Sequence, residues 1–192
     1  PVPVIVPKFK DRRPIYRTAS ELLERSANVA FDLSYIDDVM KNVRDDLLIN
    51  ARGCSWVRYE SAADADEPTE RVCIEWLHRR DFLHEPTRSW PEVTWVARRA
   101  WMTQPQMEKR FPKVDKAILT GAEYEVRHEV INRGGDDGEP KAGVWEIWHR
   151  QLRKVVWVVD GVSEILEEDK PHLKLEGFFP CPKPAYGTTK RG

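Results

Sequence analysis

Cysteine is scarce in this chain, and its cysteines form no recognisable metal or disulfide pattern. The 192 residues include only Cys54, Cys73 and Cys181, which are widely separated and contain no C-x-x-C pair. An odd number of such cysteines predicts free thiols in a reducing compartment. Cys54 and Cys73 lie in apolar runs, so we expect them to be small buried side chains rather than reactive groups.

Long apolar runs, an excess of one charge and nucleotide-binding motifs are also missing. No apolar run approaches the length of a membrane span, and the first residues do not resemble a signal peptide. The 31 basic and 32 acidic residues give a net charge of -1, which disfavours binding to nucleic acid or membranes through bulk charge. There is no G-x-G-x-x-G or phosphate loop, and Gly53–Ser55 is not a G-x-S-x-G motif. We therefore predict no catalytic residues and no cofactor.

Tryptophan, by contrast, is abundant. Seven of the eight tryptophans fall between Trp76 and Trp157. Tryptophan is a large, rigid residue that is common in cores and at interfaces. This composition predicts a globular protein in which aromatic contacts dominate part of the chain.

Two helices are predicted near the N-terminus as a helical hairpin. Residues 18–31 and 34–53 have apolar residues at helical spacing. Thr18 and Glu21 have the spacing of a capping box, and Gly53 is the expected C-terminal stop. The acidic pairs of the second helix are expected on a solvated face rather than at an acid–base or metal site. These pairs are Asp37–Asp38 and Asp45–Asp46.

After Cys54 the apolar pattern changes to a period of two, which indicates strands. Residues 54–60 and 71–78 are predicted to pair with each other, and residues 92–101 form a further strand. Thr103 and Gln106 predict a capped short helix. Two more strands are joined at residues 150–153 and lead to a turn at Asp160–Gly161. The candidate inward positions of these last strands are Trp145, Ile147, Trp157 and Val159.

The predicted fold class is therefore α+β, with a helical hairpin followed by a mostly antiparallel sheet and a short inserted helix. We expect an extended arm over residues 1–16, one α+β domain over 17–170, and a proline-rich linker over 171–192. Phe178 and Phe179 in that linker are expected to be exposed. The segment 132–143, with Asp136, Asp137 and Glu139, is expected to be a flexible hairpin tip, because it lacks the ligand spacing of a calcium loop.

The stretch DFLHEPTRSWPEVTWVARRAWMT, residues 81–103, combines many residues that are typical of functional sites. With His78 just before it, Asp81 and His84 could serve as ligands of zinc or iron. Pro86 and Pro91 exclude the helix that would bring these three together, and Arg88 occupies the place of the second histidine of an H-E-x-x-H motif. A structural role is favoured, and a metal-dependent enzyme stays an alternative.

A second alternative for the same stretch is nucleic-acid binding. Trp95, Arg98, Arg99 and Trp101 combine aromatic stacking surfaces with basic neighbours on one strand. The acidic residues Glu85, Glu92 and Glu108 cancel much of this charge. We therefore expect direct nucleic-acid binding only as an alternative.

This stretch resembles a segment of the portal proteins of short-tailed double-stranded DNA phages and related prophages. Those proteins carry a run similar to D-F-L-H-D-P-A-R-x-W-x-E-V-x-W-V-A, followed by an M-T or L-T helix start and a closing R-F. Here the run is residues 81–97, with Met102–Thr103 and Arg110–Phe111. Trp101 departs from the family pattern, in which a tyrosine or similar residue is expected.

Other blocks resemble the same family in the same order. VWEIWHRQLRKVVWV (144–158) is similar to a V-W-E-I-W-D-K strand pair, and LKLEGFFPCPKPAYGTT (173–189) to an L-x-x-F-F-P-x-P-x-P block. ASELLERSANVAFD (19–32) and MKNVRDDLLINARGCSWVRYE (40–60) also fit. The resemblance covers nearly the whole chain.

The resemblance implies a structural role in assembly rather than catalysis. Such portal subunits form a ring, usually of twelve, at one capsid vertex, and serve head assembly, genome packaging and DNA ejection. The matching blocks belong to the N-terminal, wing-like region. The chain is then expected to continue after Thr189 into a tunnel helix and a clip, which contact terminase and tail. Expected partners of these 192 residues are neighbouring subunits, scaffolding protein and capsid protein, without a membrane. DNA passes through the ring without binding these residues directly. The expected locations are the virion, at the capsid vertex, and the host cytoplasm during assembly.

Two groups of site residues follow from this interpretation. The first group comprises candidate packing or interface residues: Trp90, Trp95, Arg98, Arg99, Trp101, Phe178 and Phe179. The second group comprises polar residues that are expected to hold the loop between two strands: Asp81, His84, Glu85 and Arg88.

Overall fold

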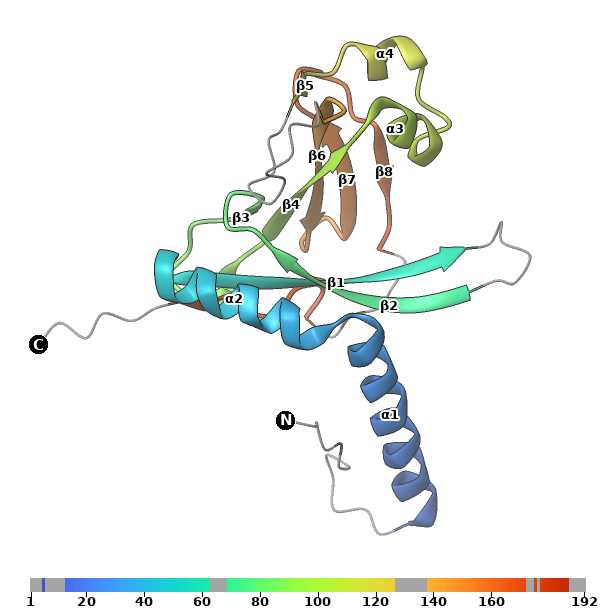
Figure 1. Ribbon diagram of the computed structural model, residues 1–192, viewed down its shortest axis with the longest axis vertical. Coiled ribbons are helices and arrows are strands. Elements are labelled where there is room, and N and C mark those ends of the chain that lie inside the picture. Colours follow the sequence, from blue (N-terminus) through green and yellow to red (C-terminus); the bar gives the residue numbers. More distant parts are fainter. Residues whose placement is uncertain are drawn as a thin grey trace, which may run out of the picture. The chain divides into compact units, whose positions relative to one another are not determined.

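The computed structural model describes Ile5, Leu175 and residues 13–62, 69–126, 138–171 and 177–186. The chain divides into two compact units (Figure 1). Unit 1 consists of Pro1–Arg79 and Pro180–Gly192, and unit 2 of Arg80–Phe179. The domain ranges expected from the sequence were 1–16, 17–170 and 171–192. The observed division differs from them, because residues 80–179 form a unit of their own.

Unit 1 combines two helices with a three-stranded antiparallel sheet of order β2-β1-β9. Its elements are α1 (Pro14–Leu33), α2 (Ile36–Asn50), β1 (Arg52–Ala62), β2 (Thr69–Leu77) and β9 (Ala185–Tyr186). The β1–β2 register runs from Cys54 opposite Leu77 to Ala62 opposite Thr69. Helix α2 lies along β1 and β2 (Figure 1). The predicted helical pair and the first strand pair are confirmed.

The helix ends differ from the predicted ones. Helix α1 begins at Pro14 with Arg13 as N-cap, so Thr18 is inside the helix and its Oγ1 donates to the carbonyl oxygen of Pro14 at 3.3 Å. Proline favours the first helical turn because its fixed φ suits a helix and its missing N–H is not needed there. Helix α2 ends at Asn50 with Ala51 in the left-handed region at φ 56°, while Gly53 belongs to β1. The predictions of a Thr18 cap and a Gly53 stop are therefore wrong.

The acidic face predicted on α2 is also only partly solvated. Asp46 is 9% exposed. Its carboxylate accepts hydrogen bonds from Trp76 Nε1 at 2.9 Å and from Asn50 Nδ2 at 3.1 Å. The buried Asp46 carboxylate is thus satisfied by the indole N–H of Trp76 on β2 and by the Asn50 amide.

Unit 2 is built on an antiparallel sheet of order β3-β4-β6-β7-β8, with β5 paired to β6. Its strands are β3 (Phe82–His84), β4 (Trp95–Met102), β5 (Tyr124–Glu125), β6 (Lys141–His149), β7 (Lys154–Val159) and β8 (Glu167–Asp169). The helices are η1 (Trp90–Glu92), α3 (Gln104–Arg110) and α4 (Lys116–Thr120). The predicted capping box of the inserted helix is present, with Thr103 as N-cap and Gln106 Oε1 accepting a hydrogen bond from the Thr103 N–H. The predicted α+β fold class is confirmed.

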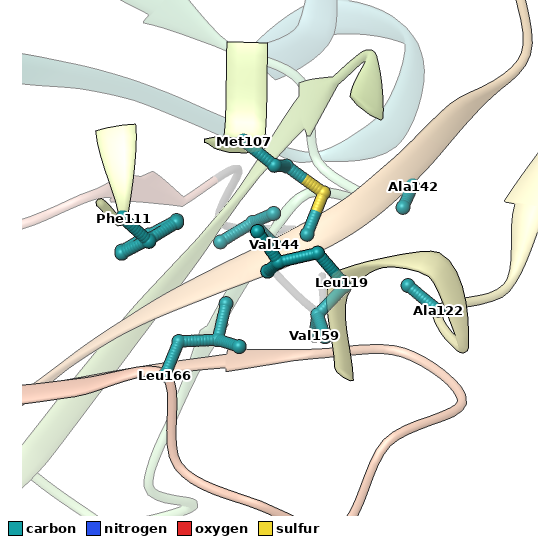
Figure 2. Packing of buried hydrophobic residues seen from close by; sticks show 8 residues of the cluster. All are labelled: Met107, Phe111, Leu119, Ala122, Ala142, Val144, Val159 and Leu166. Carbon is teal, nitrogen blue, oxygen red and sulfur yellow. The ribbon is translucent and has the colours of Figure 1, made fainter. Parts of the chain in front are cut away.

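One face of this sheet carries the hydrophobic core of unit 2. The core residues come from α3, α4, β6, β7 and the segments next to them, and their side chains meet in Figure 2. They are Met107, Phe111, Leu119, Ala122, Ala142, Val144, Val159 and Leu166.

The inward positions of β6 differ from the predicted ones. Ala142, Val144, Glu146 and Trp148 are buried, whereas Trp145 and Ile147 point to the opposite face and are only partly buried. The strand has large apolar residues on both faces, so alternation alone did not fix its register. The predicted inward position of Val159 agrees with the core, and Trp157 packs against it partly buried.

Two predicted features fall outside the described residues. The first is the part of the predicted hairpin tip that contains Asp136 and Asp137, and the second is most of the predicted N-terminal arm. Among the helices that the structure does describe, none combines the length and the apolar character that crossing a bilayer requires.

Candidate functional site

The stretch 81–103 forms β3, η1 and β4, and its side chains divide between the two faces of the unit 2 sheet. Arg99 lies opposite Trp145 in the β4–β6 register, and the adjacent Arg98 lies opposite Glu146. Because successive side chains of a strand point to opposite faces, the two arginines belong to different clusters.

The first cluster is centred on Arg99, and we call it the Arg99 cluster. Its members are Arg99, Asp81, Asp160, Trp101 and Trp145. Arg99 Nε is 2.9 Å from Asp81 Oδ1, and Arg99 Nη1 is 3.8 Å from Asp160 Oδ2. The guanidinium carbon lies 4.5 Å from the ring centre of Trp101 and 5.0 Å from that of Trp145. The cation is therefore neutralised by carboxylates and placed over two aromatic faces.

Both tryptophans of the Arg99 cluster also use their polar atom. Trp101 Nε1 donates to Asp81 Oδ1 at 3.2 Å, and Trp145 Nε1 donates to Asp160 Oδ1 at 2.9 Å. Gly143 makes room for this arrangement. A Cβ atom at Gly143 would lie 2.5 Å from Asp160 Oδ2 and 2.8 Å from Arg99 Cδ. The cluster is thus satisfied internally, and it binds Asp81 to β4 rather than to a ligand.

The second cluster lies on the core face of the sheet. It is the ion pair of Arg98 and Glu146, called the Arg98 pair, together with Trp148. Arg98 Nε is 2.6 Å from Glu146 Oε2, and Trp148 Nε1 donates to Glu146 Oε1 at 2.7 Å. The Arg98 and Glu146 side chains are only 13% and 8% exposed. The Glu146 carboxylate therefore accepts a hydrogen bond from each of two largely buried side chains.

A row of aromatic rings continues from this pair. Ring centres are 5.8 Å apart for Trp148–Phe178, 5.7 Å for Phe178–Phe179 and 5.9 Å for Phe179–Trp90. The row goes on through His84, at 5.9 Å from Trp90. These edge-to-face contacts hold the end of unit 2 against η1 and the sheet.

Phe179 is 7% exposed, which contradicts its predicted exposure. The guanidinium carbon of Arg150 lies 4.5 Å from the Phe179 ring centre, and Arg150 Nη1 donates to the carbonyl oxygen of Pro91 at 2.9 Å. Phe178 is partly buried and has a φ of 68°. This proline-rich segment has no periodic apolar pattern, so its packing could not be predicted from local spacing.

The loop residues of the stretch have different environments. Glu85 accepts hydrogen bonds from the N–H of Thr94 at 2.7 Å and from Thr94 Oγ1 at 2.6 Å. His84 Nδ1 lies 2.8 Å from the carbonyl oxygen of Glu85. Arg88 is exposed. Glu85 therefore closes the loop between β3 and β4, whereas Arg88 is on its surface.

The bonds from Thr94 hold the pKa of Glu85 below its ordinary value of 4.5, the side-chain hydrogen bond being the largest cause. A carboxyl whose folded pKa is lowered stabilises the fold above its unfolded pKa, and this contribution is lost as the pH falls through the folded pKa. Replacing Thr94 with valine should raise the Glu85 pKa toward 4.5. Carbon-detected NMR titration of the glutamate carboxyls checks this, and Thr87→Val in the same loop is the control. An unchanged Glu85 pKa in Thr94→Val would contradict the assignment.

The geometry expected for a metal site at His78, Asp81 and His84 is not observed. The described part of the chain contains no group of three or more His, Cys, Asp or Glu residues placed to hold a metal ion. Asp81 belongs to the Arg99 cluster, and His84 belongs to the aromatic row. The His78 ring packs edge-on against Trp76, with the ring centres 5.6 Å apart.

The four residues of the nucleic-acid alternative do not lie together on one face of β4. Trp95, Arg99 and Trp101 occupy alternate positions of β4, and Arg98 points to the other face. Both arginines are paired with carboxylates. A phosphate would have to displace these partners, so the strand is not a ready-made basic platform.

A set of exposed apolar residues on α1 could not be recognised as exposed from the sequence. No residue of this helix is buried. Ile15, Leu22, Val29 and Leu33 are between 57% and 70% exposed. Their spacing of seven, seven and four residues places them on one side of the helix, and we call them the α1 apolar row. The apolar spacing of this helix is visible in the sequence, but it does not tell whether the apolar side is covered.

A surface cleft of about 590 Å³ lies between the end of α3 and β8. Basic and acidic residues face each other across it, and Arg110 Nη1 is 2.7 Å from Glu167 Oε2. Arg110 also lies 4.7 Å from the ring centre of Trp157. Opposite charges that are already paired do not define a ligand for this cleft.

Comparison with known proteins adds no assignment. The chain matches no protein-family model and no curated protein.

Proposed function

We propose that the chain is a non-enzymatic structural part of a phage portal ring, corresponding to the wing-like region. The observation that carries the proposal is the order of sequence blocks from residue 19 to residue 189, which resembles that family over nearly the whole chain. Its partners are then neighbouring portal subunits, scaffolding protein and capsid protein, and its place is the capsid vertex.

The contacts of the most distinctive block support a structural role for it. Asp81, Arg98 and Arg99 are engaged with other side chains of unit 2, and Trp90 and Phe179 pack against each other. A catalytic centre needs polar groups that are directed at a substrate. In this block Asp81, Arg98 and Arg99 are directed at other side chains of the protein, whereas Arg88 lies on the surface.

The α1 apolar row supports contact with another protein chain. Burying a Leu, Ile or Val side chain contributes about 1.5–3 kcal/mol, so four half-exposed side chains are a substantial unused source of binding energy. A net charge of -1 means that identical copies repel one another little. In a ring each subunit meets two identical neighbours, so a contact repeated around the ring gains from every copy.

This contact can be tested in the complete product of the reading frame that encodes the chain. Leu22→Lys places a charge in the α1 apolar row, whereas Glu21→Lys places a lysine at the neighbouring position, away from the row. If α1 contacts a neighbouring subunit, Leu22→Lys should lower the association constant at least tenfold, because about 1.4 kcal/mol corresponds to a factor of ten. Sedimentation velocity over a range of concentrations measures this.

The control should assemble like the wild type. Equal assembly of Leu22→Lys and wild type would remove α1 from the subunit contact. A complete gene product that stays monomeric without any substitution would contradict the portal proposal itself.

A further inference from the structure

Cys54 and Cys181 belong to the two chain segments that form unit 1, one before unit 2 in the sequence and one after it. Cys54 is in β1. The segment that contains Cys181 runs back along this strand, because the Val57 N–H donates to the carbonyl oxygen of Pro180 at 2.8 Å and Gly53 pairs with Ala185. The two main chains are therefore held together on both sides of the cysteines.

The side chains of the two cysteines share one buried site. Cys54 is 4% exposed and Cys181 is 7% exposed, and both are free thiols. The two thiols interact, because the neighbouring Cys54 thiol is the largest cause of the raised pKa of Cys181. Thiols in contact on neighbouring backbone segments need little backbone movement to reach the short S–S distance of a disulfide.

We propose that Cys54 and Cys181 form a disulfide on oxidation and thereby lock residues 180–186 onto β1. The pair is then a redox-controlled latch between the two chain segments that form unit 1. This inference does not depend on the proposed function.

The oxidant is a low-molecular-weight disulfide such as oxidised glutathione. The thiolate of one cysteine attacks this disulfide, forms a mixed disulfide and releases one glutathione thiolate. The second cysteine then attacks the protein sulfur of the mixed disulfide and releases a second glutathione. The two protons lost by the cysteines go to the two released thiolates, so two thiols are oxidised and one glutathione disulfide is reduced.

The latch should close slowly while unit 1 is folded. The neighbouring Cys54 thiol, together with burial, raises the pKa of the Cys181 thiol well above its ordinary value, so little thiolate is present at neutral pH. Only two residue pairs join β9 to β1, and Tyr186 is 43% exposed. Local opening of this short pairing is therefore the route by which the oxidant reaches the thiols.

The closed latch should stabilise the protein. The disulfide would connect residues on either side of the whole of unit 2, and cross-links that close long loops restrict the unfolded chain most in the chain-entropy description. For a chain of this size we expect the midpoint of thermal unfolding to rise by about 5–10 °C.

The test uses the whole chain in glutathione redox buffers of increasing oxidised fraction. Intact-mass analysis should show the loss of two hydrogens, and peptide mapping without reductant should identify a Cys54–Cys181 cross-link. Cys73→Ser is the matched control, because Cys73 lies on β2 opposite Arg58. It should form the cross-link as the wild type does, whereas Cys54→Ala and Cys181→Ala should not.

Peptide mapping of the wild type decides the matter even if a variant folds poorly. A protein that remains folded and fully reduced in a strongly oxidising buffer would overturn the proposal. A cross-link through Cys73, or between chains, would overturn it as well. Formation of the Cys54–Cys181 bond without a rise in the unfolding midpoint would overturn its role as a latch.

Discussion

Replacing Glu146 with alanine should lower the free energy of unfolding by about 3–5 kcal/mol, because it removes one member of a buried ion pair. Arg98 would lose the carboxylate that lies 2.6 Å from its Nε, and Trp148 Nε1 would lose its acceptor. With side-chain exposures of 13% and 8%, water could not replace Glu146 fully. Urea unfolding followed by circular dichroism measures the loss.

Two further variants separate charge pairing from other effects. Glu168→Ala removes an ion pair with Lys154 in which both side chains are more than 40% exposed, and it should cost less than about 1 kcal/mol. The double variant Arg98→Met, Glu146→Leu removes both charges and should recover most of the loss, since well-packed apolar residues often replace a buried ion pair without penalty. A Glu146→Ala protein within about 1 kcal/mol of the wild type would contradict this account.

Replacing Gly53 with alanine should lower the free energy of unfolding by about 3 kcal/mol through a steric clash in unit 1. A Cβ atom at Gly53 would collide with the main-chain carbonyl oxygen of Val43 and lie 3.0 Å from Val43 Cγ1. Because Val43 is part of α2, relief of the clash requires the helix to move away from β1. A backbone atom cannot turn aside as the end of a long side chain can.

Gly177→Ala is the matched control for this substitution. A Cβ atom at Gly177 has no neighbour within 4 Å, so the change should stay within about 0.5 kcal/mol of the wild type. Urea unfolding compares the two variants, and hydrogen exchange shows where protection is lost. We expect the loss in α2 and β1. Equal stability of Gly53→Ala and Gly177→Ala would show that α2 does not pack closely on β1.

Much of the fold could be predicted because its elements carry local signals. The helical spacing before Asn50, the alternation after Cys54 and the Thr103–Gln106 capping box each depend on residues close together in the chain. Partners that are distant in the sequence could not be predicted in this way. Asp46 accepts a hydrogen bond from Trp76, which is 30 residues away in the chain, and a side chain at Gly53 would collide with the Val43 carbonyl oxygen.

The sequence indicates where the candidate site lies, but the partners of its side chains could not be predicted from it. The concentration of tryptophan, arginine and acidic residues in 81–103 marked an unusual region. Alternation along β4 separates Arg98 from Arg99, but only the pairing with β6 shows that Glu146 serves one and Trp145 stacks on the other. The carboxylate partner of Arg99 at Asp160 depends on the turn after β7, which no local pattern connects with β4.

The proposal that this chain belongs to a ring-forming portal subunit can be tested by electron microscopy of the purified complete gene product. We expect closed rings with a central channel, since heterologous contacts that close give cyclic symmetry, and the resemblance to portal proteins implies about twelve copies. Native mass spectrometry of the same sample counts the copies. Monomers at micromolar concentration, or contacts that grow into open filaments instead of rings, would contradict the claim.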